Sequence, residues 1–316
     1  MRTFHFYRRD PRGAEYAESF SLSSTLRLSG LCDKNKIGKS SIENLVARAR
    51  IVKAIRAFFD ERAFVETATP VRIAAPAPEP HIDCPPVATG GFLRASPELQ
   101  MKKLLAAGMD RIYQIGPCFR DGEKGSRHNP EFTILEWYRR NATWRDIADD
   151  MEALLARLTA SPCRAAHLSV RDAYLRFAGW DPWLEWDQDR FDFDMASKIE
   201  PALAGMGFVF LEGYPPQCAS LAVVSGGVAE RWEFYWDGLE LANCFTELCD
   251  AGEQRARFVA AKAERRGLGE ADYPLDEEFL SSVAAMGSAA GVALGIDRLV
   301  MKLLRAPDIE SVIVGS

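Results

Sequence analysis

The residues best suited to chemistry gather in the stretch FRDGEKGSRHNPEFTILEWYRR, from Phe119 to Arg140. It crowds arginines, a histidine and several carboxylates between two apolar segments. Those segments, Arg111 to Phe119 and Glu131 to Arg139, are typical of two strands, with residues 120–130 as a long charged loop between them. The bend is therefore the first candidate for a site that binds charged groups.

The returning strand separates its side chains into two faces, because side chains alternate along a strand. An aromatic ring, a carboxylate and a phenol on one face would suit an aromatic base and a cationic group. The structural alternative is a half-buried strand in which Glu136 pairs with an arginine, and this strand alone favours that alternative. The first face carries Phe132, Ile134, Glu136 and Tyr138, and the second carries Thr133, Leu135, Trp137 and Arg139.

A second hairpin is predicted around Asp237-Gly238, a dipeptide that favours the type I′ turn. Glu233 and Glu240 then lie on one face as diagonal neighbours, which is unfavourable unless a cation lies between them. The pair predicts a Mg²⁺ site completed by phosphate oxygens, and a solvated face that tolerates the pair is the alternative. The predicted register pairs Trp236 with Leu239, Tyr235 with Glu240, and Glu233 with Ala242.

Arg298 follows a small-residue strand, Gly291 to Gly295, at the start of a predicted helix. Helix N-termini attract phosphate, and arginine binds phosphate through two parallel hydrogen bonds. A structural salt bridge with Asp297 or another neighbour is an equally good explanation of Arg298 taken alone.

Composition restricts the class of protein. The chain has 316 residues, 47% of them apolar, and a net charge of -6. Strong autonomous binding of nucleic acid is disfavoured because there is no basic balance or dense basic patch. Seven cysteines without metal-ligand spacing indicate reduced thiols in a cytoplasmic protein. We find no membrane-spanning run and no secretory signal.

Strands in the middle and helices around them predict an α+β domain built on an antiparallel sheet. Residues 1–41 are expected to form an extension of unknown role, ahead of a domain at 42–316. Residues 74–80 are expected to be loop, and residues 180–194 are not assigned. The other predicted elements are a helix whose capping box is Ser40 to Glu43, helices at 97–107 with Ser96 as N-cap, 143–158, 253–266 and 297–304, and a strand at 208–211.

The combination resembles the catalytic domain of class II aminoacyl-tRNA synthetases, in particular the lysyl branch, from about residue 42 onward. FVETATP (Phe64 to Pro70) is similar to the first motif of that family, although Ala63 stands where glycine is usual. Phe119-Arg120 with RHNPEF (Arg127 to Phe132) is similar to the second motif, and Gly291 to Arg298 to the third. Three motifs in the right order are far more specific than any one of them.

The resemblance implies roles for individual residues. Arg120 would hold the α-phosphate of ATP and the amino-acid carboxylate, while Phe132 and Arg298 would enclose the adenine. Glu98 would bind the substrate α-amino group, and Glu233 and Glu240 would carry Mg²⁺. Arg127, His128 and Asn129 would line the nucleotide pocket, and Glu136, Tyr138, Asn243 and Glu247 would receive the far ammonium group of a lysine-like substrate. Strict alternation puts Asn243 and Glu247 opposite Glu240, so one shared pocket requires a bulge or a strand end between them.

The chain is most similar to a family of truncated paralogues, the elongation factor P–(R)-β-lysine ligases. Residues 1–41 are far too few for the anticodon-binding domain that precedes the catalytic domain in a lysyl-tRNA synthetase. Ala293 stands where the tRNA-charging members have glycine, and its methyl would reshape the amino-acid pocket. One departure is Gly122, which replaces a carboxylate that contacts adenine; Glu123 would replace it by a one-residue shift.

This resemblance implies an ATP-dependent ligase that activates lysine or (R)-β-lysine as an adenylate and transfers it to a lysine side chain of elongation factor P. One alternative is an enzyme that charges tRNA or a small carrier with lysine. Another is a non-catalytic paralogue that binds an amino acid, although Arg120, Glu233, Glu240 and Arg298 argue against a lost ATP site. The resemblance also implies a homodimer with Pro70 central to its interface.

Overall fold

The computed structural model describes residues 3–9, 15–21, 36–37 and 40–314. Most of its strands belong to one nine-stranded sheet. These are β5 (Val65–Glu66), β8 (Arg111–Phe119), β9 (Glu131–Arg140), β10 (Ala166–Ser169), β11 (Phe208–Tyr214), β12 (Val224–Ser225), β13 (Val228–Trp236), β14 (Leu239–Thr246) and β15 (Ala289–Gly295). Small two-stranded sheets pair β1 (Thr3–Arg9) with β2 (Glu15–Ser21), β3 (Lys36–Ile37) with β4 (Ser40–Ser41), and β6 (Arg72–Ile73) with β7 (Phe92–Leu93).

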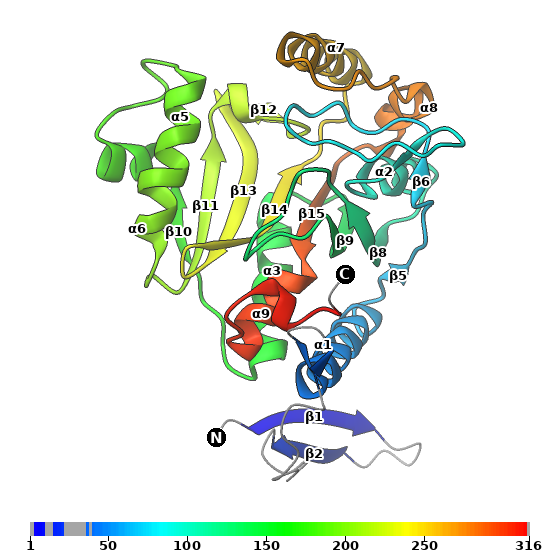
Figure 1. Cartoon of the computed structure of the whole chain (residues 1–316), viewed down its shortest axis with the longest axis vertical. Coiled ribbons are helices and arrows are strands. Elements are labelled where there is room, and N and C mark those ends of the chain that lie inside the picture. Colours follow the sequence, from blue (N-terminus) through cyan, green and yellow to red (C-terminus); the bar gives the residue numbers. More distant parts are fainter. Residues whose placement is uncertain (1–2, 10–14, 22–35, 38–39, 315–316) are drawn as a thin grey trace.

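Helices surround the main sheet (Figure 1). They are α1 (Ile42–Asp60), α2 (Glu98–Ala106), α3 (Trp144–Thr159), α4 (Val170–Ala173), α5 (Gln188–Asp194), α6 (Glu200–Leu203), α7 (Ala251–Leu268), α8 (Glu277–Ser282) and α9 (Ile296–Leu304). Shorter π or 3-10 turns are η1 (Tyr174–Ala178), η2 (Met195–Ile199), η3 (Pro216–Cys218), η4 (Val283–Met286) and η5 (Ile309–Ser311).

The main sheet is antiparallel through its centre, in the order β10-β11-β13-β14-β15-β9-β8-β5, with β12 beside β13. Parallel pairing within it is confined to the two ends, β10 with β11 and β5 with β8. The predicted α+β class with an antiparallel sheet flanked by helices is confirmed. The proposed division of the chain at residue 41 stays a prediction, and residues 1–2, 10–14, 22–35 and 38–39 lie outside the described residues.

Two hydrophobic cores form on opposite faces of the sheet. Trp137 of β9 packs in the first core with Phe59 of α1 and Leu155 of α3. Tyr138, the next residue of β9, belongs to the second core, with Leu105 of α2. The predicted alternation of side chains along β9 is therefore confirmed, and the face that carries Glu136 and Tyr138 lies on the side of the second core.

The hairpin between β13 and β14 turns as predicted at Asp237-Gly238. Both residues have positive φ, 45° and 72°, as the type I′ turn requires. The pairs of Trp236 with Leu239 and Tyr235 with Glu240 are confirmed, but Glu233 lies opposite Asn243 and not Ala242. A β-bulge accounts for the difference, because Leu241 is left between the partners of Tyr235 and Phe234.

Several predicted helix limits shift by one residue. Ser41, not Ser40, is the N-cap of α1, and its Oγ accepts the Asn44 N–H at 3.1 Å. The Ser40 hydroxyl is used elsewhere, because it donates to the carbonyl of Ser311 at 3.0 Å. The helix α2 starts at Glu98, whose N–H donates to Ser96 Oγ at 2.9 Å, so Ser96 still satisfies the helix start.

The remaining predicted elements are present. The helix with Thr143 as its N-cap, the strand from Phe208, the helix over 253–266 and the junction of β15 with α9 all form. In the unassigned region, α5 holds Trp180 through its indole N–H, which donates to Asp194 at 2.8 Å. Ala63 has a φ of 58°, which explains physically why glycine suits this position. The cysteines of the described residues are all free thiols.

Gly291 of β15 makes room for a tyrosine on the neighbouring strand. It lies opposite Tyr138 of β9, and a Cβ added to Gly291 would be 2.0 Å from a carbon of the Tyr138 ring. Both atoms belong to rigid groups, so neither side chain nor strand can give way cheaply. The absence of a side chain at Gly291 therefore leaves the space that the Tyr138 ring occupies.

We predict that Gly291→Ala lowers the free energy of unfolding by about 2 kcal/mol or more, as overpacking of a filled site does. Urea denaturation followed by circular dichroism measures this change. Gly295→Ala is the matched control, because its nearest neighbours would be 3.9 Å from the added carbon. An equal loss of stability in the two variants would contradict the role assigned to the Tyr138 ring.

Candidate active site

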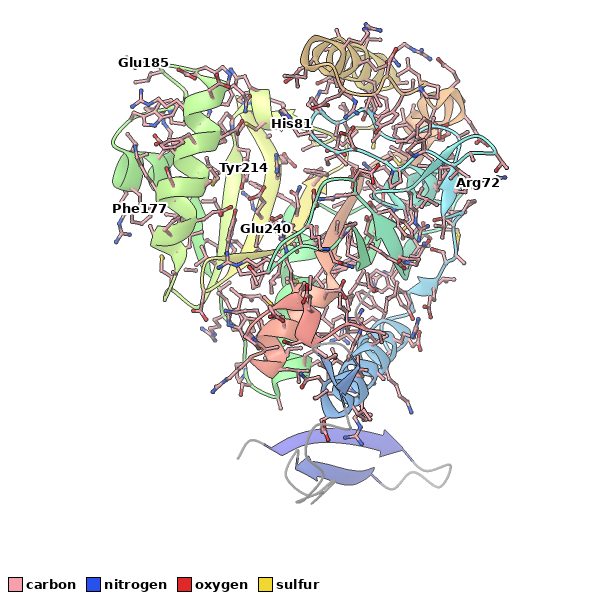
Figure 2. The ribbon with its side chains drawn as sticks, viewed as in Figure 1. Arg72, His81, Phe177, Glu185, Tyr214 and Glu240 are labelled. Carbon is pink, nitrogen blue, oxygen red and sulfur yellow. The ribbon has the colours of Figure 1, made fainter. Side chains whose placement is uncertain are left out.

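The polar face of the sheet forms the floor of a cavity of about 380 Å³. Figure 2 shows the side chain of Glu240 in the middle of the molecule, above the central strands. All the predicted site residues line this one cavity: Glu98, Arg120, Arg127, His128, Asn129, Phe132, Glu136, Tyr138, Glu233, Glu240, Asn243, Glu247, Ala293 and Arg298. The structure therefore brings them together, while their individual roles stay predictions.

A row of side chains crosses the sheet along this floor. Glu233 of β13 lies opposite Asn243 of β14, which lies opposite Ala293 of β15, which lies opposite Glu136 of β9. Residues directly opposite each other point to the same side of a sheet. The bulge at Leu241 allows Asn243 to share the face of Glu240, as the sequence required for a common pocket.

Glu136 is fully buried at one end of the row. Its Oε1 accepts a hydrogen bond from Ser96 Oγ at 2.6 Å, and its Oε2 accepts one from the Tyr138 hydroxyl at 2.8 Å. Its partners are thus hydroxyls, so the alternative in which an arginine pairs with Glu136 is wrong. Burial, and after it the negative charge of Glu98, raises the pKa of Glu136 to about 7. The two hydroxyls hold the Glu136 carboxylate in place, and it has no ion-pair partner among the described residues.

Lys102 of α2 forms ion pairs with two further carboxylates of the cavity wall. Its ammonium lies 2.5 Å from Glu98 and 2.5 Å from Glu247, and all three side chains are largely withdrawn from solvent. Burial alone would lower the pKa of Lys102, but Glu247 and Glu98 raise it above its ordinary value. The sequence analysis missed Lys102, although its i,i+4 spacing from Glu98 is a detectable signal.

Glu247 keeps some of its binding capacity despite this ion pair. Burial raises its pKa to about 8, Lys102 opposes that shift, and Glu98 adds to it. Its Oε1 is buried and accepts no hydrogen bond from any described residue. An unpartnered carboxylate oxygen is costly to bury, so this atom is well placed to accept a donor from a ligand.

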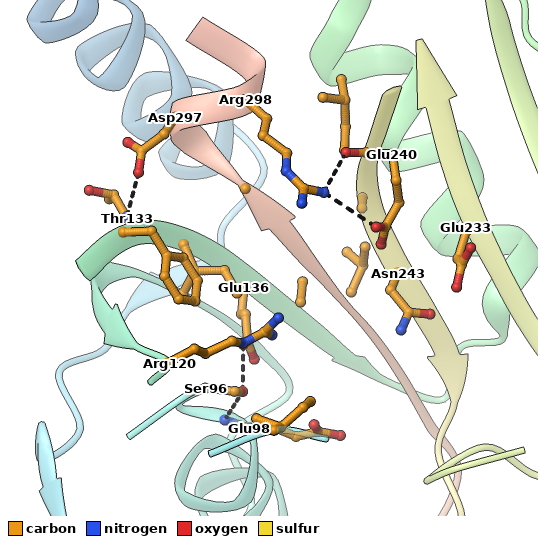
Figure 3. A pocket seen from close by; sticks show the side chains of 18 of the residues that line it. Ser96, Glu98, Arg120, Thr133, Glu136, Glu233, Glu240, Asn243, Asp297 and Arg298 are labelled. Carbon is orange, nitrogen blue, oxygen red and sulfur yellow. Dashed lines mark hydrogen bonds and ion pairs between the residues drawn. The ribbon is translucent and has the colours of Figure 1, made fainter. Parts of the chain in front are cut away.

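Arg298 lies at the opposite end of the cavity from Glu98, beside Glu240 (Figure 3). Arg298 Nη1 donates to the backbone carbonyl of Glu240 at 2.9 Å and lies 3.3 Å from its Oε2. The alternative partner, Asp297, is occupied elsewhere: its Oδ1 lies 2.5 Å from Arg48, and its Oδ2 accepts the Thr133 N–H at 2.9 Å. Arg298 is therefore free of Asp297 and reaches over the cavity.

The charged loop supplies the wall next to Arg298. Arg298 Nε donates to the Arg127 carbonyl at 3.3 Å, and Arg298 Nη2 contacts His128 Nε2. Burial, and then Arg298, lowers the pKa of His128, which favours the neutral ring as an acceptor. The Arg120 guanidinium carbon lies 5.2 Å from the centre of the Phe132 ring, a cation–π distance.

The residues after Arg120 form a tight turn. Gly122 has a φ of 79°, and the N–H of Asp121 donates to the carbonyl of Asp83 at 2.8 Å. Glycine suits this backbone conformation, and Glu123 then returns a carboxylate to the cavity wall, 3.5 Å from Arg120. The replacement of the lost carboxylate by Glu123 stays a prediction that this geometry allows.

The acidic pair Glu233 and Glu240 lies between the two ends. Glu233 is held by Arg231 at 2.6 Å and by the hydroxyl of Tyr235 at 2.7 Å. Burial, and then the charge of Glu233, raises the pKa of Glu240. No group of three or more His, Cys, Asp or Glu side chains suited to a metal occurs in the described part of the chain. A cation here would need ligands from phosphate or water.

Comparison with known families now adds to this geometry. The sequence matches the family described as tRNA synthetases class II (D, K and N) over residues 35–314. The chain belongs to this family. The antiparallel sheet and the second and third motifs, which line its cavity, are thus those of a class II synthetase domain. In the described residues, no helix combines the length and apolar character needed to cross a membrane.

Several curated relatives are described as elongation factor P–(R)-beta-lysine ligase. The one from Proteus mirabilis is 38% identical over 312 residues, which cover 87% of this chain and 95% of that protein. The one from Hamiltonella defensa is 36% identical over 307 residues, covering 86% and 94%. A relative from Haemophilus influenzae is 37% identical over 307 residues, covering 87% and 95%.

We predict that the affinity for lysine or β-lysine falls as the pH is lowered from 8 to 6. The ammonium needs ionised carboxylates, and the pKa values of Glu247 and Glu136 are raised to about 8 and about 7. Below each value a proton must leave before the ligand binds, which costs about tenfold in affinity per pH unit. Calorimetry in two buffers of different ionisation enthalpy measures both the affinity and the protons released.

Glu247→Gln is the control, because it removes one of the two titrating groups and should flatten the upper part of the profile. Affinity that stays constant from pH 6 to pH 8 in the unaltered protein would show that these carboxylates do not face the ligand.

Proposed function

We propose that this protein uses ATP to activate lysine or (R)-β-lysine as an aminoacyl-adenylate and transfers the acyl group to a lysine side chain of elongation factor P. One observation carries the proposal: a single cavity is lined both by the buried carboxylates of Glu136 and Glu247 and by the guanidinium groups of Arg120 and Arg298. The names of the relatives point to the same reaction and acceptor.

The carboxylate end fits a substrate with an ammonium group at its far end. Among the described residues, Lys102 forms ion pairs with Glu98 and Glu247, while Glu136 has hydroxyl partners only. When all three are ionised, one cation leaves two negative charges without compensation. The far ammonium would bind Oε1 of Glu247, with Glu136, Tyr138 and Asn243 completing its surroundings.

Ala293 narrows the middle of the same pocket. Its methyl stands in the row between Asn243 and Glu136, where glycine would leave open space. A substrate whose amino group is displaced along the carbon chain would therefore lie differently over this position. This supports the choice of (R)-β-lysine over lysine as the preferred substrate.

Arg120, Phe132 and Arg298, which line the cavity, fit ATP. Arg120 would hold the α-phosphate and the amino-acid carboxylate, and Arg298 and Phe132 would enclose the adenine. In the first step a carboxylate oxygen of the amino acid attacks the α-phosphorus, and the bond from that phosphorus to pyrophosphate breaks. Positioning and charge stabilisation account for such a step without a covalent nucleophile on the protein.

Glu233 and Glu240 would hold Mg²⁺ beside the phosphates. The fit is supported by two carboxylates on one face of the cavity, because the charge of Glu233 raises the pKa of Glu240 even though Arg231 and Arg298 lie beside the pair. When bound, the ion would neutralise phosphate charge. Arg231 and Tyr235 orient Glu233, so one ligand is fixed before any ion arrives.

In the second step the amine of the acceptor lysine attacks the acyl carbon, and AMP leaves with the electrons of the broken bond. A translation factor as acceptor would place this reaction in the cytoplasm.

We also propose a homodimer, with the segment from Phe64 to Pro70 in its interface. Light scattering that finds a monomer would exclude the homodimer. Pro70 is fixed by Arg94, which donates to its carbonyl at 3.3 Å.

We predict that labelled β-lysine and ATP place the label on elongation factor P and not on tRNA when both are offered. Gel electrophoresis followed by mass spectrometry of the acceptor detects the new amide bond. Arg298→Ala should lower the rate by about a hundredfold, as expected for the loss of a group that stabilises transition-state charge. Glu277→Gln, an exposed side chain at the start of α8, is the control and should react normally.

Three outcomes separate the candidates. Label on elongation factor P supports the proposal, while label on tRNA alone identifies a tRNA-charging enzyme. Absence of ATP–pyrophosphate exchange with lysine and with both β-lysine enantiomers would instead identify an amino-acid-binding protein without catalysis.

A further inference from the structure

Glu79 is a carboxylate of the cavity wall to which the family motifs assign no role. It comes from the loop between β6 and β7, and it lines both the main cavity and a side cavity of about 30 Å³. Its Oε2 accepts a hydrogen bond from Ser220 Oγ at 3.3 Å. Across residues 40–314, no lysine, arginine or histidine comes close enough to Glu79 to form an ion pair. Arg120 and Arg231 lower the pKa of Glu79 from a longer distance, but a partly buried carboxylate without an ion-pair partner still needs a reason.

Glu79 lies at the same end of the cavity as Glu98. The two residues share the wall of the side cavity with Ser96 and Ile82. Burial raises the pKa of Glu79, and the negative charge of Glu98 is the next largest cause. Two carboxylates so placed repel each other until a cation lies between them.

The loop holds Glu79 firmly. Arg265 of α7 is completely buried, and its Nη1 donates to the Glu79 carbonyl at 2.7 Å and to the Ile82 carbonyl at 3.1 Å. Its Nη2 lies 2.6 Å from Asp83 Oδ1. These bonds fix the backbone from 79 to 83. Figure 2 shows His81, in this segment, above the central strands. The carboxylate is therefore presented to the cavity by a rigid support.

We propose that Glu79 binds the substrate directly and, together with Glu98, receives the amino group that lies nearest the reacting carboxylate. The inference rests on the proposed function, because it assumes an amino-acid substrate in this cavity. Lys102 already offsets part of the charge of Glu98 and Glu247. Glu79 has no such partner, so an ammonium group bound between Glu79 and Glu98 would relieve the repulsion and donate to both.

The proposal gives the two ammonium groups of the substrate separate receptors. Glu247 and Glu136 take the far group, and Glu79 with Glu98 takes the near one. A residue that binds only the near group should discriminate between amino acids that have it and analogues that lack it. This property distinguishes direct binding from a general structural role.

The test is calorimetry with the full chain and its Glu79→Gln variant, which keeps the shape of the side chain and removes its charge. The ligands are lysine, (R)-β-lysine and 6-aminohexanoate, which has the carboxylate and the far ammonium but no near amino group. We expect the variant to bind lysine and β-lysine about tenfold more weakly or worse, since a hydrogen bond to a charged group is lost. Its affinity for 6-aminohexanoate should stay within about twofold of that of the unaltered protein.

Two further measurements complete the test. Glu79→Asp retains the charge and should bind lysine with an affinity between those of the unaltered protein and Glu79→Gln. The affinity for ATP should be unchanged in both variants; an effect on ATP instead of lysine would overturn the proposal and assign Glu79 to the ATP site. Glu277→Gln serves as the control for loss of a surface carboxylate.

The outcomes distinguish the two claims. If the unaltered protein binds lysine or β-lysine and Glu79→Gln binds them equally well, the role of Glu79 is refuted and the proposed function stands. Equal losses for lysine and 6-aminohexanoate would also refute it, because they indicate a distorted pocket. If the unaltered protein binds neither lysine isomer, the proposed function itself fails.

Discussion

The excess of buried carboxylate over buried cation is the constraint on which this site depends. Burying an ionised carboxylate costs several kcal/mol unless a partner compensates it. Lys102 compensates Glu98 and Glu247 at once, at 2.5 Å from each, and leaves Glu136 with hydroxyl partners only. The folded protein therefore holds a cavity that is electrostatically incomplete. A ligand with ammonium groups completes it, and this deficit is the physical origin of the specificity we propose.

The shortage of buried cations is tolerable because the sheet fixes the carboxylates on rigid strands. Glu136 and Asn243 stand in one transverse row because β9, β15 and β14 pair without a shift there. The bulge at Leu241 brings Glu240 onto the same side. Gly291 leaves the space in which the Tyr138 ring lies flat and reaches Glu136. Each feature is a local backbone property, and together they preorganise the site before a ligand arrives.

Much of this arrangement could be predicted from the sequence because it follows local rules. Alternation along β9 separated Glu136 from Trp137, and Asp237-Gly238 indicated the turn that pairs β13 with β14. The pairing of Glu233 was wrong by one residue because a bulge leaves no signature in composition or alternation. Even so, the conflict between Asn243 and Glu240 indicated that a bulge or a strand end was needed between them.

The residues that escaped prediction act over long distances in the sequence. Lys102 meets Glu247, and Arg265 meets Asp83, only after the chain has folded. Glu79 looked like part of a proline-rich loop, and its role depends on the buried arginine that supports that loop. Periodicity reports which face of an element a residue occupies, but it does not report which distant charge lies across a cavity.

The most direct test of the central claim compares lysine with 2-aminoheptanoate, in which a methyl group replaces the far ammonium. Calorimetry at pH 8 with the unaltered protein gives the two affinities. The excess of buried carboxylate predicts that lysine binds at least about a hundredfold more tightly, because the analogue leaves that excess negative charge without a second cation. Affinities equal within about threefold would contradict the account, since the buried charge of Glu136 and Glu247 would then play no part in recognition.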